Sequence, residues 1–211
     1  MPPTQQRLWP ELECVPPQFV LYGGTAIALR LGHRQSIDFD FFSSEPFEHE
    51  QLFHSLPMLR GAKRLQSRLN TLSVEIDRGG PVELSFFGGL TLGRVAEPDR
   101  AQGNGLRVAS MLDLAGMKAA VVQERALRKD YLDIAALLKS GLQLADALAA
   151  AGALYGEQFN PFITIKALSY FSDGDLPRLP DETMQFLTQA AAAVREIPVI
   201  KRRSDKIVDL P

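Results

Sequence analysis

The sequence has little cysteine, no long apolar run and no excess of positive charge. Cys14 is the single cysteine among 211 residues, which excludes an internal disulfide framework and a zinc site built from cysteines. No apolar stretch approaches the roughly 20 residues that span a bilayer, and the opening residues contain prolines where a secretory signal has its apolar core. A formal net charge of −2 leaves any nucleic-acid contact to a local patch. These absences predict a cytoplasmic protein with no membrane partner.

The N-terminal half of the chain is dominated by strand patterns. The expected strands are residues 18–22, 36–42, 64–69, 71–77 and 82–87, and the expected helices between them are residues 25–31 and 48–59. Gly32 is the expected end of the first of these helices. The proline-rich residues 1–17 read as irregular, with one short helix around Leu8–Leu12.

From residue 88 onward the pattern changes. Residues 88–109 read as a glycine-rich connection without strands, and the expected helices that follow are residues 111–124, 128–139, 142–151, 160–170 and 181–196. Strands first and helices later predict an α+β fold. We expect a mixed β-sheet with flanking helices in residues 1–109 and a helical C-terminal region in residues 110–211.

Two aspartates, Asp38 and Asp40, lie one residue apart among three phenylalanines in the stretch IDFDFF. Residues two apart in a strand point to the same face, so both carboxylates project together and repel each other. A divalent cation relieves this repulsion, and magnesium prefers such oxygen ligands while leaving part of its shell for phosphates. The alternative is a solvated strand face without a ligand.

A glycine pair, Gly23-Gly24, ends the apolar run before the first expected helix. Glycines allow backbone N–H groups to approach a ligand closely, and the N-terminus of a helix favours an anion. If that helix returns beside the first strand, the glycine turn and the aspartate pair meet at one end of a sheet. Phosphate oxygens would then lie between backbone donors and a metal held by carboxylates.

A third carboxylate is the usual companion of such a pair in phosphoryl transfer. Glu83 is the only acid of the strand VELSFF, and Ser85 follows on the same face. Glu75 and Asp77 on the preceding strand are the reserves. The alternative for Glu83 is an exposed strand position.

The run GGTAIALRLGHRQSIDFDFF resembles the opening motif of the nucleotidyltransferases typified by the AbiEii/AbiGii abortive-infection toxins, within the polymerase-β-like superfamily. That motif has a glycine turn, a short helix and then two aspartates between hydrophobic residues. The run SMLDLAGMKAAVVQERALRKDYLDIAALLKSG is similar to the helical segment of the family. The resemblance covers roughly residues 18–141 and implies a nucleotidyltransferase-type sheet.

The resemblance also implies residue roles. Gly23, Gly24 and Thr25 would contact the phosphates of a nucleoside triphosphate, with Arg34 and Ser36 near them. Asp38 and Asp40 would hold Mg²⁺ or Mn²⁺, with Glu83 as the candidate third ligand. From the helical part, Lys118 would supply positive charge, and Asp130 and Asp133 would orient the helices or position substrate. These last three are also compatible with an ordinary solvated or capped helix turn.

The implied activity is magnesium-dependent transfer of a nucleoside monophosphate from an NTP to an acceptor hydroxyl, with an RNA such as tRNA as the implied acceptor. The implied setting is the toxin of a toxin–antitoxin pair with a cognate antitoxin. One departure matters: members of this family often carry an aspartate on the later strand, and this chain has Ser85 at the position aligned with it. Two alternatives therefore stay open, a nucleotide- or RNA-binding module with an impaired site, and a glycosyltransferase that uses its two aspartates to hold a sugar nucleotide.

Overall fold

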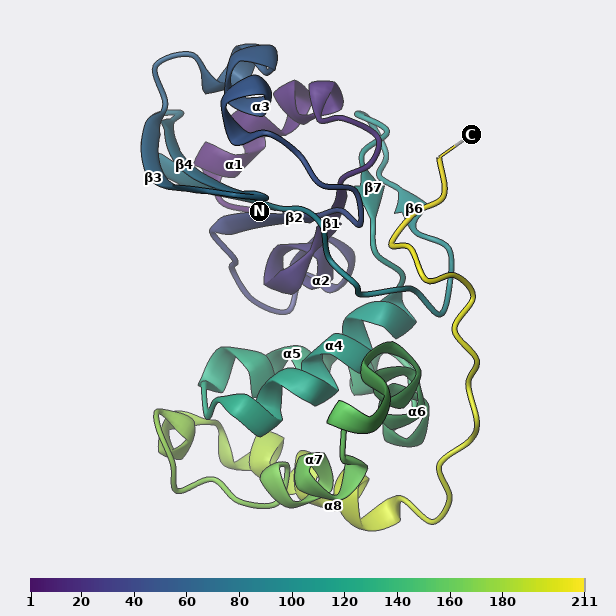
Figure 1. The fold of residues 1–211 in the computed structure, drawn as a ribbon. Helices are drawn as coiled ribbons and strands as arrows, with labels where there is room; N and C mark the ends of the chain where they lie inside the picture. The colour runs from purple at the N-terminus through teal and green to yellow at the C-terminus, as the bar shows by residue number, and fades with distance from the viewer. Residues whose placement is uncertain (211) are drawn as a thin grey trace. The chain divides into compact units, whose positions relative to one another are not determined.

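The computed structural model describes residues 1–210, which form two compact units. The first unit comprises Met1–Ser110 together with the segment from Ser204 onward, and the second comprises Met111–Arg203. Figure 1 shows the sheet of the first unit and the helices of the second. The α+β prediction is confirmed by this architecture and by the relatives described below.

A mixed sheet of seven strands, in the order β3-β4-β5-β2-β1-β7-β6, forms the first unit. The strands are β1 Val20–Tyr22, β2 Asp38–Phe42, β3 Lys63–Arg68, β4 Thr71–Asp77, β5 Pro81–Phe87, β6 Asp99–Arg100 and β7 Arg107–Val108. Strand β2 runs parallel to β5 and β1 runs parallel to β7, while the other pairs are antiparallel. The two central strands, β2 and β5, hold the acidic residues of interest.

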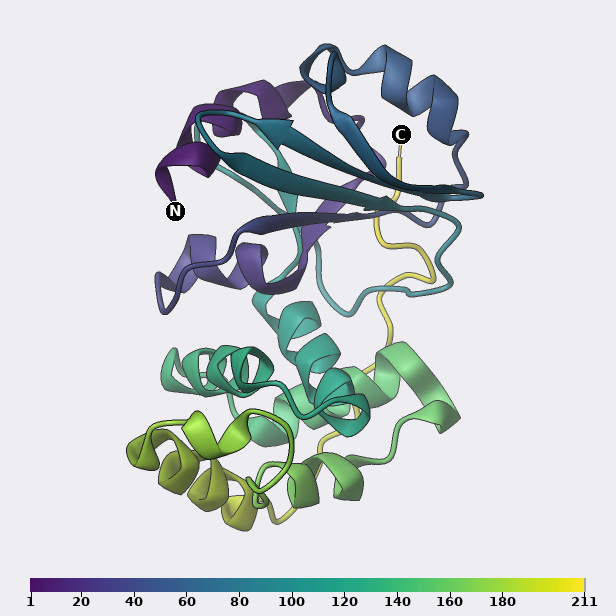
Figure 2. The same cartoon turned by 90° about the vertical axis from the view of Figure 1, so that its left-hand side faces the viewer.

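The two faces of the sheet differ because β2 and β5 alternate in polarity. Phe39, Phe41, Leu84 and Phe86 are fully buried on one face, where Phe41 stacks on Phe86 with 4.9 Å between ring centroids. Helices α1 (Pro3–Leu8) and α3 (His49–Ser55) lie on this side of the sheet, and α2 (Gly23–Leu31) lies on the other, as Figures 1 and 2 show. The acidic residues of β2 and β5 therefore face the side of α2.

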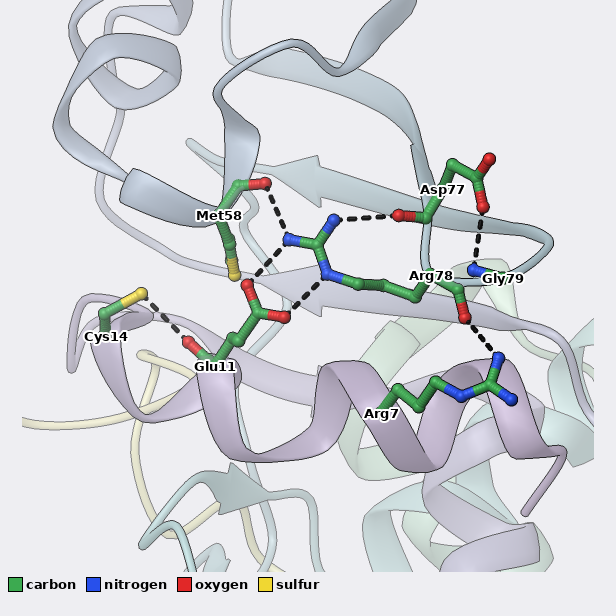
Figure 3. Close-up of polar contacts among 7 residues, drawn as sticks. All are labelled: Arg7, Glu11, Cys14, Met58, Asp77, Arg78 and Gly79. Carbon is green, nitrogen blue, oxygen red and sulfur yellow. Dashed lines mark hydrogen bonds and ion pairs between the residues drawn. The ribbon is translucent and has the colours of Figure 1, made fainter.

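The N-terminal helical segment is tied to the turn between β4 and β5 (Figure 3). The Arg78 guanidinium donates to both carboxylate oxygens of Glu11, at 2.6 and 2.7 Å, and to the carbonyl oxygen of Met58. Arg7 in turn donates to the carbonyl oxygen of Arg78 at 2.8 Å. The hydrogen bond from Arg78 lowers the pKa of Glu11, so this pair is ionised at neutral pH and holds the turn that follows α1.

Five α-helices form the second unit: α4 Met111–Glu124, α5 Arg128–Lys139, α6 Leu144–Tyr155, α7 Pro161–Ala167 and α8 Asp181–Ala193. Their core gathers buried aliphatic and aromatic side chains, among them Tyr131, Leu148 and Leu187. No single helix in residues 1–210 is long and apolar enough to span a membrane. Among these residues, one pair of consecutive helical segments is long and apolar enough when taken together, Arg128–Lys139 and Leu144–Gln158. The chain bends by 118° between the two segments.

The C-terminal segment departs from the expected division of the chain. Residues 110–211 were expected as one helical region, but the chain returns to the first unit at Ser204. Arg94, 3% exposed, donates to the carbonyl oxygen of Lys206 at 2.8 Å and to the carboxylate of Asp209 at 2.5 Å. Ile207 is also buried, at 1% exposure. A buried arginine and an apolar contact therefore hold this segment. Neither produces a periodic pattern in the sequence, so the sequence does not predict the return of the chain.

Two further expectations about local structure are wrong. The N-terminal residues are more helical than expected, with α1 followed by a 3-10 turn over Trp9–Cys14. The connection 88–109 contains β6 and β7, and β7 extends the sheet beyond β1. Strands of two residues are too short to show alternation, so the sequence pattern does not reveal them.

Candidate functional site

The glycine pair opens α2 directly after β1. Tyr22 is the extended residue before the helix, and Gly23 has φ +74°, a conformation that side chains rarely adopt. The predicted helix over residues 25–31 is thus confirmed but begins at Gly23; it ends at Leu31, and Gly32 follows as its C-cap with φ 61°. The first N–H groups of a helix have no intrahelical partner, so this turn presents donors suited to an anion.

The backbone at Gly23 lies against Asp40. A Cβ atom built on Gly23 would come within 2.5 Å of Asp40 Oδ2, so any side chain here displaces that carboxylate. A Cβ atom on Gly24 would overlap the Arg34 guanidinium and come within 3.1 Å of Ser36 Oγ. The two glycines are thus required by close approach of their neighbours.

The side chains expected around the phosphates gather at this turn. Thr25, which is buried, donates through Oγ1 to the carbonyl oxygen of Asp38 in a short hydrogen bond. Since Gly24 contacts Arg34 and Ser36 and Gly23 contacts Asp40, both sequence motifs converge at one end of the sheet. The geometry brings together seven of the sequence-predicted residues: Gly23, Gly24, Thr25, Arg34, Ser36, Asp38 and Asp40.

The strand register places the remaining acid. In the parallel pairing of β2 with β5, Asp38 lies opposite Glu83 and Asp40 lies opposite Ser85. Paired positions share a face, so Glu83 is on the face of the aspartates, next to Asp38. Neighbouring strands are about 4.8 Å apart, and residues two apart along a strand are about 6.6 Å apart. The diagonal distance from Glu83 to Asp40 is therefore longer than the direct distance from Glu83 to Asp38. Glu83 is half-buried.

Ser85 holds a fixed place beside Asp40. It is 6% exposed, and its hydroxyl shares a hydrogen bond of 2.8 Å with the hydroxyl of Ser73 on β4. Ser73 was not among the sequence-predicted residues. Alternation along Thr71–Asp77 places it on the polar face, but only the hairpin register, Ser73 opposite Ser85, reveals the pair.

The donor set suits a hard divalent cation. The acidic side chains on this face offer only carboxylate oxygens, which magnesium prefers. Within residues 1–210, no three His, Cys, Asp or Glu side chains are gathered closely enough to hold a metal ion by themselves. A cation bound here would therefore take further ligands from phosphate oxygens or water, as magnesium commonly does.

The three predicted residues of the second unit form a buried ion cluster. Lys118 Nζ, on α4, lies 2.6 Å from Asp130 Oδ1 and 2.7 Å from Asp133 Oδ2, both on α5. Both aspartate side chains are 0% exposed and Lys118 is 6% exposed. Arg125, which precedes α5, donates to both carboxylate oxygens of Asp130, at 2.8 and 3.1 Å. These contacts join α4 to α5.

The charge state of the cluster follows from its contacts. Burial alone would raise the pKa of Asp130, but the hydrogen bonds and charges of Arg125 and Lys118 outweigh it and hold the pKa of this carboxyl below its usual value. Asp130 is therefore ionised at neutral pH. A carboxylate with a depressed pKa stabilises the folded state above its unfolded-state pKa, and this stabilisation is lost as the pH falls through the folded-state pKa.

The chain is similar to proteins of three bacteria. It is 31% identical over 158 residues to "Uncharacterized protein aq_aa25" of Aquifex aeolicus (strain VF5), and this alignment covers 74% of each chain. JHP933 from Helicobacter pylori superposes with a TM-score of 0.58 at 17% identity, covering 90% of this chain and 88% of that one. MenT4, nucleotidyltransferase toxin Rv2826c from Mycobacterium tuberculosis H37Rv, has a TM-score of 0.55 at 15% identity and covers 91% of each chain. At such identities the two structural likenesses show the fold.

The family follows from the sequence itself. Residues 15–198 match the profile of the family described as "Nucleotidyl transferase AbiEii toxin, Type IV TA system". This range includes the glycine turn, the aspartate pair and the cluster around Lys118. The resemblance inferred from the two motifs is thus confirmed, and the chain belongs to the AbiEii nucleotidyl transferase toxin family.

Proposed function

We propose that this protein transfers a nucleoside monophosphate from an NTP to the hydroxyl of an RNA acceptor, with tRNA as the first candidate. One observation carries the proposal: the glycine turn and the aspartate pair meet at one end of the sheet, with Gly23 against Asp40. Backbone donors for an anion and carboxylates for a cation therefore lie side by side, as transfer of a phosphoryl group requires. Membership of a toxin family supports a cognate antitoxin as partner.

The residues of the first unit divide into two roles in this proposal. Gly23, Gly24 and Thr25, with Arg34 and Ser36, would bind and orient the phosphates of the NTP. Asp38 and Asp40 would hold the divalent cation, with Glu83 beside Asp38. When bound, Mg²⁺ or Mn²⁺ would make the acceptor hydroxyl more acidic and neutralise the charge of the departing pyrophosphate.

The cluster around Lys118 is the proposed contribution of the second unit. An ammonium group has three N–H donors, and Asp130 and Asp133 account for two of them. In the proposal Lys118 supplies positive charge for the nucleotide, and the two aspartates fix the direction of the lysine and the packing of α4 on α5. The aspartates are thus positioning residues.

The alternative is a binding module that holds nucleotide or RNA without transferring it. Ser85 favours this alternative, because it lies opposite Asp40, at the position where the family resemblance implies an aspartate. The position of Glu83 favours transfer, because its register opposite Asp38 puts a third carboxylate on the same face. A glycosyltransferase finds no support in the family match.

Label transfer tests the proposal directly. Purified protein is incubated with each α-labelled NTP, Mg²⁺ or Mn²⁺, and total tRNA, beside an Asp38→Ala/Asp40→Ala variant. We expect label on RNA with the wild-type protein and none with the variant, because the variant lacks both cation ligands of β2. Nucleotide binding measured by calorimetry without any transfer, over all four NTPs and both cations, would instead support the binding module.

Glu83→Gln tests whether Glu83 assists the cation or whether Asp38 and Asp40 suffice. If Glu83 assists the cation, the variant should require a higher concentration of Mg²⁺ for half-maximal transfer and lose roughly 10- to 100-fold in rate at low Mg²⁺. The matched control is Glu182→Gln, which removes an exposed carboxylate from the first turn of α8. Equal Mg²⁺ dependence in wild type and Glu83→Gln would show that the aspartate pair suffices.

A further inference from the structure

Gln5 is a buried amide with an unused donor. Its side chain belongs to α1 and is 1% exposed. Its Nε2 group has no hydrogen-bond partner among the residues that the structure describes. Burying an amide N–H without a partner costs free energy, and such groups are rare in folded proteins. An unused buried donor therefore calls for a ligand that accepts the hydrogen bond.

The surroundings of Gln5 indicate which ligand that is. Gln5 lines a cavity of about 20 Å³ together with the polar residues Thr25, Arg34 and Ser36 and the apolar residues Met1, Ala28 and Leu29. The three polar residues are those expected around the phosphates of the nucleotide. A cavity of this size has room for one water-sized group, such as a single oxygen atom. The same opening therefore has polar side chains from α1, from α2 and from the loop before β2.

The position of Gln5 is fixed by the contacts of its own helix. Arg7, two residues later, donates to the carbonyl oxygen of Arg78, and the Glu11–Arg78 ion pair holds the following turn (Figure 3). The segment that follows Gln5 is thus fastened to the turn between β4 and β5. A side chain presented from such a support is directed before the ligand arrives, which reduces the entropic cost of binding.

We propose that Gln5 donates a hydrogen bond to a phosphate oxygen of the bound nucleotide, making the N-terminal helix a part of the nucleotide site. The inference rests on the proposed function, since it requires a triphosphate at the glycine turn. Gln5 is a substrate-binding residue that lies outside both sequence motifs. The competing occupant of the cavity is an ordered water molecule.

The test compares stability with nucleotide affinity in Gln5→Met. This substitution keeps the length of the side chain and removes the buried donor. We expect Tm to rise by about 2–4 °C because an unpaired polar group is removed. We expect the Kd for Mg-NTP, measured by calorimetry, to rise roughly tenfold because a hydrogen bond to a charged oxygen is lost. Magnesium tripolyphosphate should lose the same factor, since the contact is to phosphate.

The matched control is Gln6→Met, which changes an exposed neighbour whose Nε2 donates to the carbonyl oxygen of Met1. It should leave both Tm and Kd unchanged. A lower Tm with unchanged Kd in Gln5→Met would show a water-filled structural site and overturn the inference. A loss confined to Mg-NTP, with tripolyphosphate unaffected, would overturn the assignment to phosphate. Wild-type protein that binds no NTP would overturn the proposed function as well.

Discussion

Asp40→Asn is expected to lower the rate of label transfer by roughly 10³-fold. Asparagine has the size and shape of aspartate but no negative charge, so the substitution removes a cation ligand and little else. Asp40 is the carboxylate that Gly23 approaches, and it lies opposite Ser85 rather than opposite an acid. No neighbouring carboxylate on β5 is therefore placed to take over its role.

The stability of the variant shows whether the loss is one of chemistry. Asn fits the space between Gly23 and β5, so we expect Tm to stay within a few degrees of the wild-type value. Asp181→Asn, at the exposed start of α8, is the matched control and should retain full transfer. Transfer by Asp40→Asn within tenfold of wild type would contradict the assignment of Asp40 as a cation ligand.

Lys118→Met is expected to destabilise the second unit by about 3–5 kcal/mol, because breaking a buried ion pair leaves a buried charge without its partner. Asp130 and Asp133 both have fully buried side chains, and Lys118 lies within 2.7 Å of each. Methionine fills a similar volume but offers neither charge nor donor. Asp130 keeps the hydrogen bonds of Arg125, which offset part of this loss.

Guanidinium unfolding, followed by the helical signal at 222 nm, measures this effect. Lys129→Met is the matched control, since Lys129 is an exposed lysine on α5; its change should stay within about 0.5 kcal/mol. The dependence of stability on pH below neutrality is a second measurement. Because the pKa of Asp130 is held below its usual value, wild-type stability should fall as the pH drops through that lowered pKa, and Lys118→Met should begin to lose stability at higher pH. A loss below 1 kcal/mol would contradict a structural role for the cluster.

The parts of this site that the sequence predicted are those with a local cause. The turn at Gly23 requires glycine, and the two aspartates of β2 alternate with buried phenylalanines, so both features are visible in consecutive residues. The helices 111–124 and 128–139 are predicted with their observed bounds, because long amphipathic patterns are the clearest signal that a sequence contains.

The parts that the sequence did not predict depend on register or on distant contacts. Whether Glu83 or Ser85 lies beside Asp40 is decided by the pairing of β2 with β5, which no pattern within either strand specifies. The partners of Lys118 lie 12 and 15 residues away on another helix. Gln5 belongs to a segment expected to be irregular, and nothing around it in the sequence indicates a buried amide.

The return of the chain at Ser204 makes the helical unit an insertion within the first unit. During synthesis the sheet emerges early, but Arg94 has to wait for Lys206 and Asp209, which lie 112 and 115 residues further on. The first unit is therefore completed only after Asp209 has left the ribosome. Premature termination anywhere in the helices would release a sheet without its closing segment, so a truncated product would lack a finished copy of either unit.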